Sequence, residues 1–95
     1  MKVSWTPEAL KTYYNILDYL QTNWSNKEIQ KFVIKTNKVI NQISMNPGMF
    51  RHSIQKNIHI GFITKQTCVI YKLNPNEIVL IVFWDNRQNP QKLKY

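Results

Sequence analysis

The sequence is poor in cysteine, glycine and proline, and each shortage excludes a class of protein. The single cysteine, Cys68, permits no internal disulfide and no cysteine-rich zinc site, which favours a reducing compartment such as the cytoplasm. With only two glycines and four prolines, the chain is neither collagen-like nor of low complexity. Gly48 and Gly61 cannot form a glycine-rich phosphate loop, so nucleotide-dependent chemistry is not expected.

Long apolar segments are also lacking. The longest apolar run, residues 78–84, has seven residues, whereas a membrane helix needs about 20. The first residues reach Pro7 and Glu8 without the apolar stretch of a signal peptide. We therefore expect a cytoplasmic protein that does not interact with membranes.

Acidic residues are scarce relative to basic ones. The 95 residues include 13 Lys and Arg but only 5 Asp and Glu, which gives a net charge of +8. This surplus favours nucleic acid or acidic proteins as partners. The content of 43% hydrophobic and 19% charged residues is typical of a globular chain, and its length predicts a single domain, 1–95.

Apolar residues at spacings of three and four predict a helix from Thr6 to about Asn23, with Thr6 as N-cap and Pro7 at its first position. The residues expected on its apolar face are Leu10, Tyr13, Leu17, Leu20 and Trp24. The short connection to the next helix predicts an antiparallel helical hairpin.

The second helix is predicted to begin at a capping box made by Ser25 and Glu28 and to end at Asn46-Pro47-Gly48. Its expected apolar stripe consists of Ile29, Phe32, Val33, Thr36, Ile40 and Ile43.

Beyond Gly48 the apolar period changes from 3.6 to 2, which predicts strands at 58–62, 67–73 and 78–84, with an edge strand at 2–5. The predicted fold is α+β in the order β-α-α-β-β-β, with the N-terminal helical hairpin packed on one face of a curved antiparallel β-sheet. The alternation places His59 opposite Ile58 and Ile60, on the face expected to be turned away from the helices.

The last strand is apolar on both faces, although two helices can cover only one face of the sheet. The residues expected on the second face are Val79, Ile81 and Phe83, or their alternates. Either the tail at 88–95 or a partner protein is needed to cover them.

Several short motifs, in this order, resemble the RelE/ParE family of toxins from bacterial type II toxin–antitoxin pairs. They are Trp5-Thr6-Pro7-Glu8-Ala9, Ile16-Leu17-Asp18-Tyr19-Leu20, Ile43 with Asn46-Pro47, Val69-Ile70-Tyr71, and Asp85-Asn86-Arg87-Gln88-Asn89-Pro90. The resemblance covers roughly residues 2 to 93. It implies a toxin that forms a hetero-oligomer with its cognate antitoxin protein, which covers hydrophobic toxin surface.

Family members act in one of two ways. RelE-like members cleave messenger RNA on the ribosome without metal, whereas ParE-like members poison DNA gyrase. The resemblance implies growth inhibition through translation, by ribosome-dependent mRNA cleavage. Gyrase poisoning by a non-enzymatic protein, or a nucleic-acid-binding domain without toxicity, are the alternatives. Cys68 stands where RelE has a strand arginine, and Tyr95 lies beyond the family's terminal tyrosine; the missing arginine favours gyrase poisoning.

Metal-free cleavage of RNA requires a base, a cation on the phosphate and an acid. Arg87 matches the family's arginine after the last strand, Lys56 lies in the region of its lysines, and His59 has the intrinsic pKa suited to acid–base work. These three are the predicted catalytic residues. The alternatives are an ion pair of Arg87 with Asp85 and a surface histidine without function. The spacing of the histidines and carboxylates predicts no metal site, and no cofactor is expected.

Lysines of the second helix fall on the side opposite its apolar stripe and are candidates for nucleic-acid binding. The alternative is that they form a solvated outer face without a binding role. They are Lys27, Lys31, Lys35 and Lys38. Lys65, in the turn after residues 58–62, and Trp84, close to Arg87, complete the predicted nucleic-acid-binding set.

Overall fold

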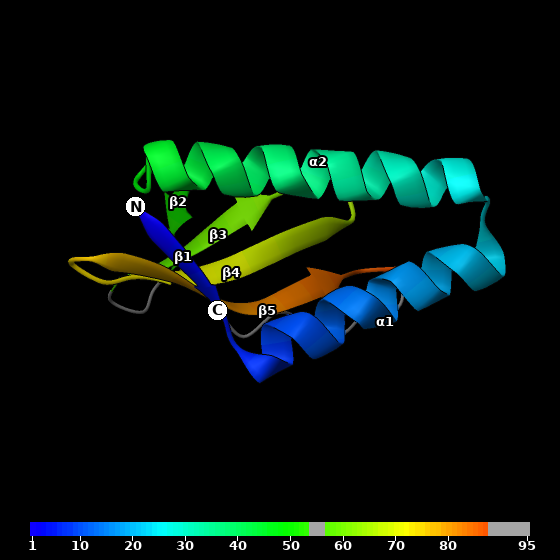
Figure 1. The fold of residues 1–95 in the computed structure, drawn as a ribbon, viewed down its shortest axis with the longest axis horizontal. Coiled ribbons are helices and arrows are strands. Elements are labelled where there is room, and N and C mark those ends of the chain that lie inside the picture. Colours follow the sequence, from blue (N-terminus) through cyan, green and yellow to red (C-terminus); the bar gives the residue numbers. More distant parts are fainter. Residues whose placement is uncertain (54–56, 88–95) are drawn as a thin grey trace.

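The computed structural model describes residues 1–53 and 57–87, which form a helical hairpin packed on a mixed β-sheet (Figure 1). The elements in chain order are β1 (Lys2–Trp5), α1 (Pro7–Asn23), α2 (Asn26–Met45), β2 (Arg51–His52), β3 (Ile58–Phe62), β4 (Thr67–Leu73) and β5 (Glu77–Asp85). The predicted fold is confirmed, and the short strand β2 is an addition to it.

The strands lie in the order β1-β5-β4-β3-β2. Pairing is antiparallel from β2 through β5, as predicted, but the edge strand β1 runs parallel to β5. A parallel pair requires a long connection, which the helices and the other strands provide here. The predicted strand at 78–84 becomes β5, which has a neighbour on each side.

The start of α1 is also the point where this helix is fixed to the sheet. The Thr6 hydroxyl accepts a hydrogen bond from the Ala9 backbone N–H at 3.0 Å, as an N-cap does, and donates to the Ile81 carbonyl at 2.8 Å. The predicted capping box at the start of α2 is wrong, because the Ser25 side chain makes no capping hydrogen bond. The Glu28 carboxylate lies instead 3.9 Å from Lys31 Nζ.

The helices bury a face that differs in part from the predicted one. In α1, Ala9 and Ile16 join Leu20 in the core, whereas Leu10 and Trp24 are 44% and 53% exposed. The buried face of α1 includes Ala9 in place of its neighbour Leu10. The larger side chain of Leu10 therefore points outward. Three residues of the predicted α2 stripe, Phe32, Thr36 and Ile43, are buried, and Val39, which the prediction omitted, is buried with them.

The two faces of β3 are the reverse of the prediction. His59 lies on the helix-facing side with Tyr71, its partner on β4, while Ile58 and Ile60 belong to a second apolar cluster on the other face. A Cβ atom at Gly61 would lie 3.3 Å from Ile43 Cδ1 of α2, as expected for the helix-facing side. Both faces of β3 are buried, so alternation alone did not indicate which one meets the helices.

A β-bulge in β5 explains a second difference. Ile70 pairs with Val82 while Tyr71 pairs with Leu80, so Ile81 is an extra residue in the strand. Beyond it the alternation reverses, and Phe83 packs in the helix-side core rather than on the second face. The tail at 88–95, one predicted cover for that second face, lies outside the described residues.

Candidate functional site around Arg87

Arg87 follows the last strand and turns back onto Asp85. Arg87 donates to the Asp85 carboxylate from its backbone N–H at 2.8 Å, from Nε at 3.2 Å and from Nη2 at 2.8 Å. The Thr67 hydroxyl of β4 donates to the same carboxylate at 2.8 Å. The ion pair that the sequence left open as an alternative role for Arg87 is therefore present.

The electrostatics of this pair are those of a buried acid held by several donors. Burial alone would raise the pKa of the Asp85 carboxyl, but the hydrogen bonds from Arg87 and Thr67 outweigh it and leave that pKa below its ordinary value. The hydrogen bonds to Asp85 likewise stabilise the charged Arg87 guanidinium and raise its pKa above the ordinary value. Both groups are charged at neutral pH, and the pair is fixed in one geometry.

Arg87 also lines a cavity of about 200 Å³ between the helical hairpin and the β3–β4 turn. Its other charged lining residues are Glu28, Lys31 and Lys35, all from α2, and Leu20 and Phe32 contribute apolar walls. The cavity therefore combines three cations with one carboxylate, a set of charges suited to an anionic ligand.

The structure does not bring His59 to this site. His59 is 1% exposed, its ring lies 5.2 Å from the Tyr71 ring, and its Nδ1 is 3.1 Å from the Phe50 carbonyl oxygen. His59 pairs with Tyr71 of β4, and Asp85 pairs with Thr67 of the same strand. Tyr71 and Thr67 are four residues apart, which corresponds to about 13 Å along the strand. His59 is thus a core residue in its placement, and its catalytic role stays a prediction.

The remaining predicted residues are divided among several places. Lys56 lies outside the described residues. Lys27 and Lys38 are exposed on α2 but are not among the described residues that line the Arg87 cavity. Lys65 and Trp84 line a separate hollow of about 130 Å³ next to the second apolar cluster, where Trp84 Nε1 donates to Asn86 Oδ1 at 3.0 Å.

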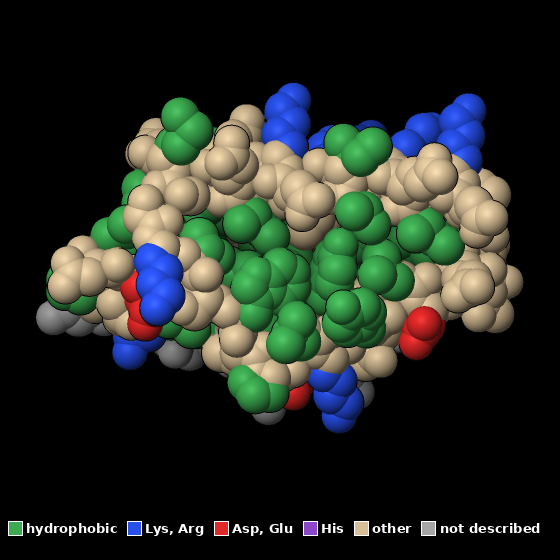
Figure 2. Space-filling model, viewed as in Figure 1, with side chains coloured by type: hydrophobic (Ala, Val, Ile, Leu, Met, Phe, Trp, Pro, Cys, Tyr) green, Lys and Arg blue, Asp and Glu red, His purple; other side chains and the backbone are tan. Residues whose placement is uncertain are grey.

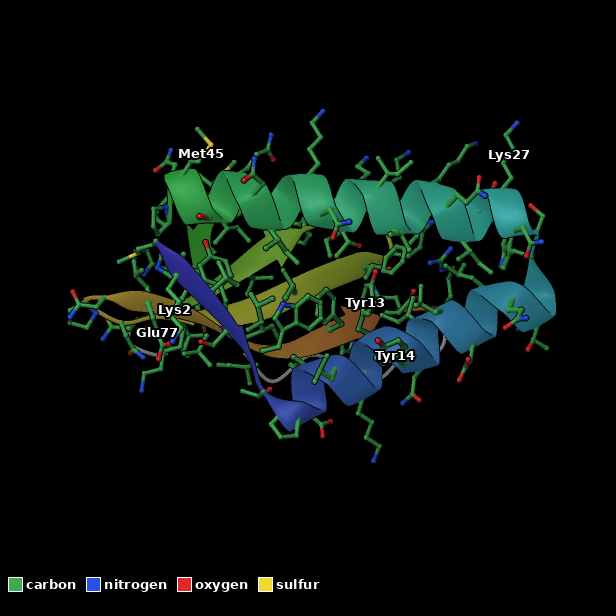
Figure 3. All side chains as sticks on the ribbon, viewed as in Figure 1. Lys2, Tyr13, Tyr14, Lys27, Met45 and Glu77 are labelled. Carbon is green, nitrogen blue, oxygen red and sulfur yellow. The ribbon has the colours of Figure 1, made fainter. Side chains whose placement is uncertain are left out.

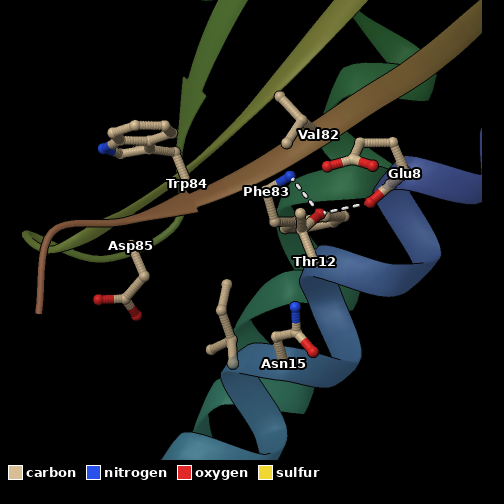
Figure 4. A pocket seen from close by; sticks show the side chains of 8 residues that line it. Glu8, Thr12, Asn15, Val82, Phe83, Trp84 and Asp85 are labelled. Atoms are coloured by element: carbon tan, nitrogen blue, oxygen red, sulfur yellow. Dashed lines mark hydrogen bonds between the residues drawn. The ribbon is translucent and has the colours of Figure 1, made fainter. Parts of the chain in front are cut away.

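A third concavity, of about 270 Å³, lies between α1 and the end of β5 (Figure 4). At its wall the Thr12 hydroxyl donates to the Glu8 carbonyl at 2.7 Å and accepts from the Phe83 N–H at 2.9 Å. The carboxylates of Glu8 and Asp85 line it, and none of its described lining residues is a lysine or arginine. This cleft is therefore unsuited to anions.

An apolar surface lies between the two helices, which separate from each other toward β1 (Figures 1 and 2). Trp5 and Tyr13 meet edge to face with ring centroids 5.3 Å apart, and Tyr14 lies 5.9 Å from Tyr13. In Figure 3, Tyr13 lies between the helices and Tyr14 lies over α1 beside it. Tyr14 is 58% exposed, and Leu10, one turn earlier on α1, is 44% exposed. We call Trp5, Leu10, Tyr13 and Tyr14 the interhelical surface.

Within residues 1–53 and 57–87, no three His, Cys, Asp or Glu side chains gather as metal ligands. In the same residues, neither helix has the length and apolarity required to cross a membrane.

Sequence reasoning missed Glu28 and Thr64 as residues of the Arg87 cavity. Glu28 was predicted to be part of a helix cap, and no sequence signal indicated that the β3–β4 turn, which contains Thr64, lies against α2. The i, i+4 spacing of Lys31 and Lys35 did carry a signal, because such residues share one helix face.

Neither a protein-family model nor a curated protein sequence matches the chain. Solved structures do match. The chromosomal ParDE TA system from P. aeruginosa aligns with a TM-score of 0.75 at 16% identity, over 90% of this chain and 95% of that one. The YoeB/ParE toxin from Agrobacterium tumefaciens gives 0.62 at 15% identity, over 90% and 98% of the two chains.

The YoeB-YefM complex from Staphylococcus aureus aligns with a TM-score of 0.57 at 20% identity, over 88% of this chain and 94% of that one. All three alignments cover most of both chains, so they include the helical hairpin as well as the sheet. The chain has the fold of these toxins, which is the RelE/ParE fold that the sequence predicted.

Proposed function

We propose that this protein is the toxin of a toxin–antitoxin pair and is held inactive by a partner protein that covers its interhelical surface. The observation that carries the proposal is this surface itself, on a chain with the fold of toxins solved within ParDE and YoeB-YefM assemblies. Tyr14 and Leu10 leave large apolar areas in contact with water, which is typical of a binding site for another protein.

The charges around the interhelical surface indicate the chemistry of the partner. Lysine side chains project from the outer edge of α2, beyond the apolar surface (Figure 2), and the whole chain carries a net charge of +8. A segment with apolar residues toward the toxin and acidic residues at its borders would match both features. We infer an acidic antitoxin segment.

For the free toxin, the geometry favours growth inhibition by binding a target, as in ParE-like gyrase poisoning, over cleavage of RNA. Two of the three predicted catalytic residues belong to the described part of the chain. Of these, Arg87 is held by Asp85 and His59 is buried in the core. A buried imidazole cannot reach the 2′-hydroxyl of an RNA without opening the core.

Ribosome-dependent mRNA cleavage is the second candidate, and the Arg87 cavity favours it. Glu28 could act as a base there and a lysine as an acid, with Arg87 on the phosphate. Should expression leave growth unaffected and no antitoxin exist, the non-toxic nucleic-acid-binding domain is the remaining interpretation.

The proposal is tested by inducing the chain in bacteria, alone and together with the product of any short reading frame that lies next to its gene. We expect growth arrest alone and relief by the second protein. Tyr14→Asp should stay toxic but resist relief, because a buried aspartate would cost binding energy. Met45→Asp is the matched control, because Met45 is 79% exposed and points away from the interhelical surface (Figure 3).

Relief of Tyr14→Asp as complete as that of Met45→Asp would contradict the docking surface. Normal growth with the wild-type chain at confirmed soluble expression would contradict the toxin proposal itself.

A further inference from the structure

The second apolar cluster, on the sheet face opposite the helices, is buried more deeply than an uncovered face allows. Its buried members, Ile58, Ile60, Cys68 and Ile70, come from β3 and β4, and the residues packed against them come from β5. Ile60 is only 1% exposed and Ile70 0%. A side chain on an uncovered sheet face keeps contact with water, so another layer of protein lies over these two.

This cover is narrow and belongs to the chain itself. Ile60 and Ile70 are buried within a single chain, whose helices pack on the other face of the sheet. Phe62, on the same face of β3 two residues after Ile60, is 50% exposed. The cover therefore lies over the middle of the face and leaves its margin open, as a single extended segment does and a second domain-sized body does not.

The two segments outside the described residues differ in their reach. Residues 54–56 connect Ser53 to Asn57 at the end of the sheet where the Ser53 N–H donates to the Ile58 carbonyl at 2.8 Å. A loop of three residues extends at most about 7 Å from its ends, so it cannot run along the face. Residues 88–95 follow Arg87 directly, and eight residues can extend about 26 Å.

The distance from Arg87 to the middle of the face suits residues near 93. Trp84 and Asn86 line the hollow at the edge of this face, so the chain leaves β5 beside it. Ile60 pairs with Ile70, which pairs with Val82 of β5. From strand spacing and rise, the centre of this row lies about 14 Å from the end of β5. Leu93, six residues after Arg87, can reach about 20 Å.

We propose that residues 88–95 fold back over the second apolar cluster and place Leu93 and Tyr95 against Ile60 and Ile70. Leu93 and Tyr95 alternate with Lys92 and Lys94, so an extended segment presents its apolar side chains to the sheet and its lysines to water. A second copy is a poor cover, because each chain carries a charge of +8. The closed face directs a protein partner to the interhelical surface on the other side.

The only cysteine of the chain, Cys68, reports on this cover because it belongs to the cluster and is 6% exposed. The rate at which its thiol reacts with DTNB in the folded protein is measured for two double variants. Leu93→Asp with Tyr95→Asp changes the apolar side chains, and Lys92→Gln with Lys94→Gln changes the intervening ones. Each pair lowers the net charge by two, so attraction of the anionic reagent changes equally. We expect at least about tenfold faster reaction for the first pair and under about twofold change for the second.

Equal rates in the two double variants would overturn the proposal. Reaction of the wild-type thiol as fast as in the unfolded chain would also overturn it, because the face would then be open until another protein binds. Protection of the wild-type thiol that disappears on dilution would identify a second copy as the cover and overturn the assignment to residues 88–95.

NMR on the wild-type chain tests the same contact without a substitution. Nuclear Overhauser effects are expected between the Leu93 methyl groups or the Tyr95 ring and the methyl groups of Ile60 and Ile70. They should persist at low protein concentration. Leu93 and Tyr95 signals at random-coil positions, without these effects, would contradict the fold-back of the segment.

Discussion

Asp85 and Arg87 form a pair in which the acid is buried and the base reaches the surface. The Asp85 side chain is 1% exposed and the Arg87 side chain 24%, with Asp85 Oδ2 2.8 Å from Arg87 Nη2. Because Thr67 on β4 donates to the same carboxylate, the pair connects the end of β5 to the neighbouring strand. Asp85 therefore couples the stability of the sheet to the geometry of the cavity.

Replacing Asp85 with asparagine should lower the free energy of unfolding by about 2 kcal/mol, somewhat below the value for breaking a fully buried pair. The change leaves Arg87 without its counter-charge. Urea unfolding followed by tryptophan fluorescence measures the effect. The control is Asp18→Asn, an exposed acid on α1, which should change the free energy by under about 0.5 kcal/mol.

The same pair determines the response to acid. The pKa of Asp85 in the folded state lies below its ordinary value, so the stabilisation is complete above the unfolded-state pKa and is lost as pH falls through the folded-state pKa. Unfolding free energies measured between neutral pH and the acid range should fall more steeply for the wild type than for Asp85→Asn. Parallel curves would show that Asp85 is not the responsible group.

Tyr71 should show the opposite dependence, at alkaline pH. Its hydroxyl donates to the Pro47 carbonyl at 2.8 Å, and burial raises its pKa to about 12. The stabilisation is therefore complete below the ordinary tyrosine pKa of about 10 and is lost as pH rises toward about 12. In Tyr71→Phe the free energy of unfolding should fall less over this pH window. The tyrosinate absorbance of this variant should lack the group that titrates at the highest pH. An unchanged titration curve would be inconsistent with this role.

The contact between β3 and α2 is tested by two glycine substitutions. At Gly61 a Cβ would lie 3.3 Å from Ile43 Cδ1 and 3.3 Å from Phe50 Cδ2, so Gly61→Ala should destabilise the fold by about 1 kcal/mol. A Cβ atom at Gly48 would have no atom within 4 Å other than those of Gly48 and its chain neighbours. Gly48→Ala should therefore be neutral or slightly stabilising. Thermal unfolding compares them, and equal melting temperatures would contradict the helix-facing placement of Gly61.

The burial of His59 predicts unequal reactivity of the two histidines. His52 is exposed, whereas His59 is buried with its Nε2 out of contact with water. Diethyl pyrocarbonate should therefore modify His52 in the folded protein and His59 only after unfolding, as peptide mass spectrometry can show. Modification of both at similar rates would place His59 at the surface, as the sequence predicted.

The sequence was informative wherever a residue's role depends on its neighbours along the chain. The Thr6 cap, the helix end at Asn46 and the strand at Thr67–Leu73 follow from local spacing and turn chemistry. The Arg87 to Asp85 pairing was also visible as an alternative, since the two residues are two positions apart.

What the sequence did not reveal depends on contacts between distant elements. The face of β3 that meets α2 was reversed because both faces are buried, and the bulge at Ile81 has no glycine to mark it. The division of the α2 lysines into cavity and non-cavity pairs follows from where the β3–β4 turn meets that helix, which spacing alone does not give.

The measurement that tests the central claim most directly is a map of messenger RNA 5′ ends shortly after the chain alone is induced, with Arg87→Ala at matched soluble expression as control. A toxin that acts by binding should arrest growth without new in-frame cuts in either sample. New cuts within ribosome-occupied messages that disappear in Arg87→Ala would contradict this account and establish Arg87 as part of a ribonuclease site.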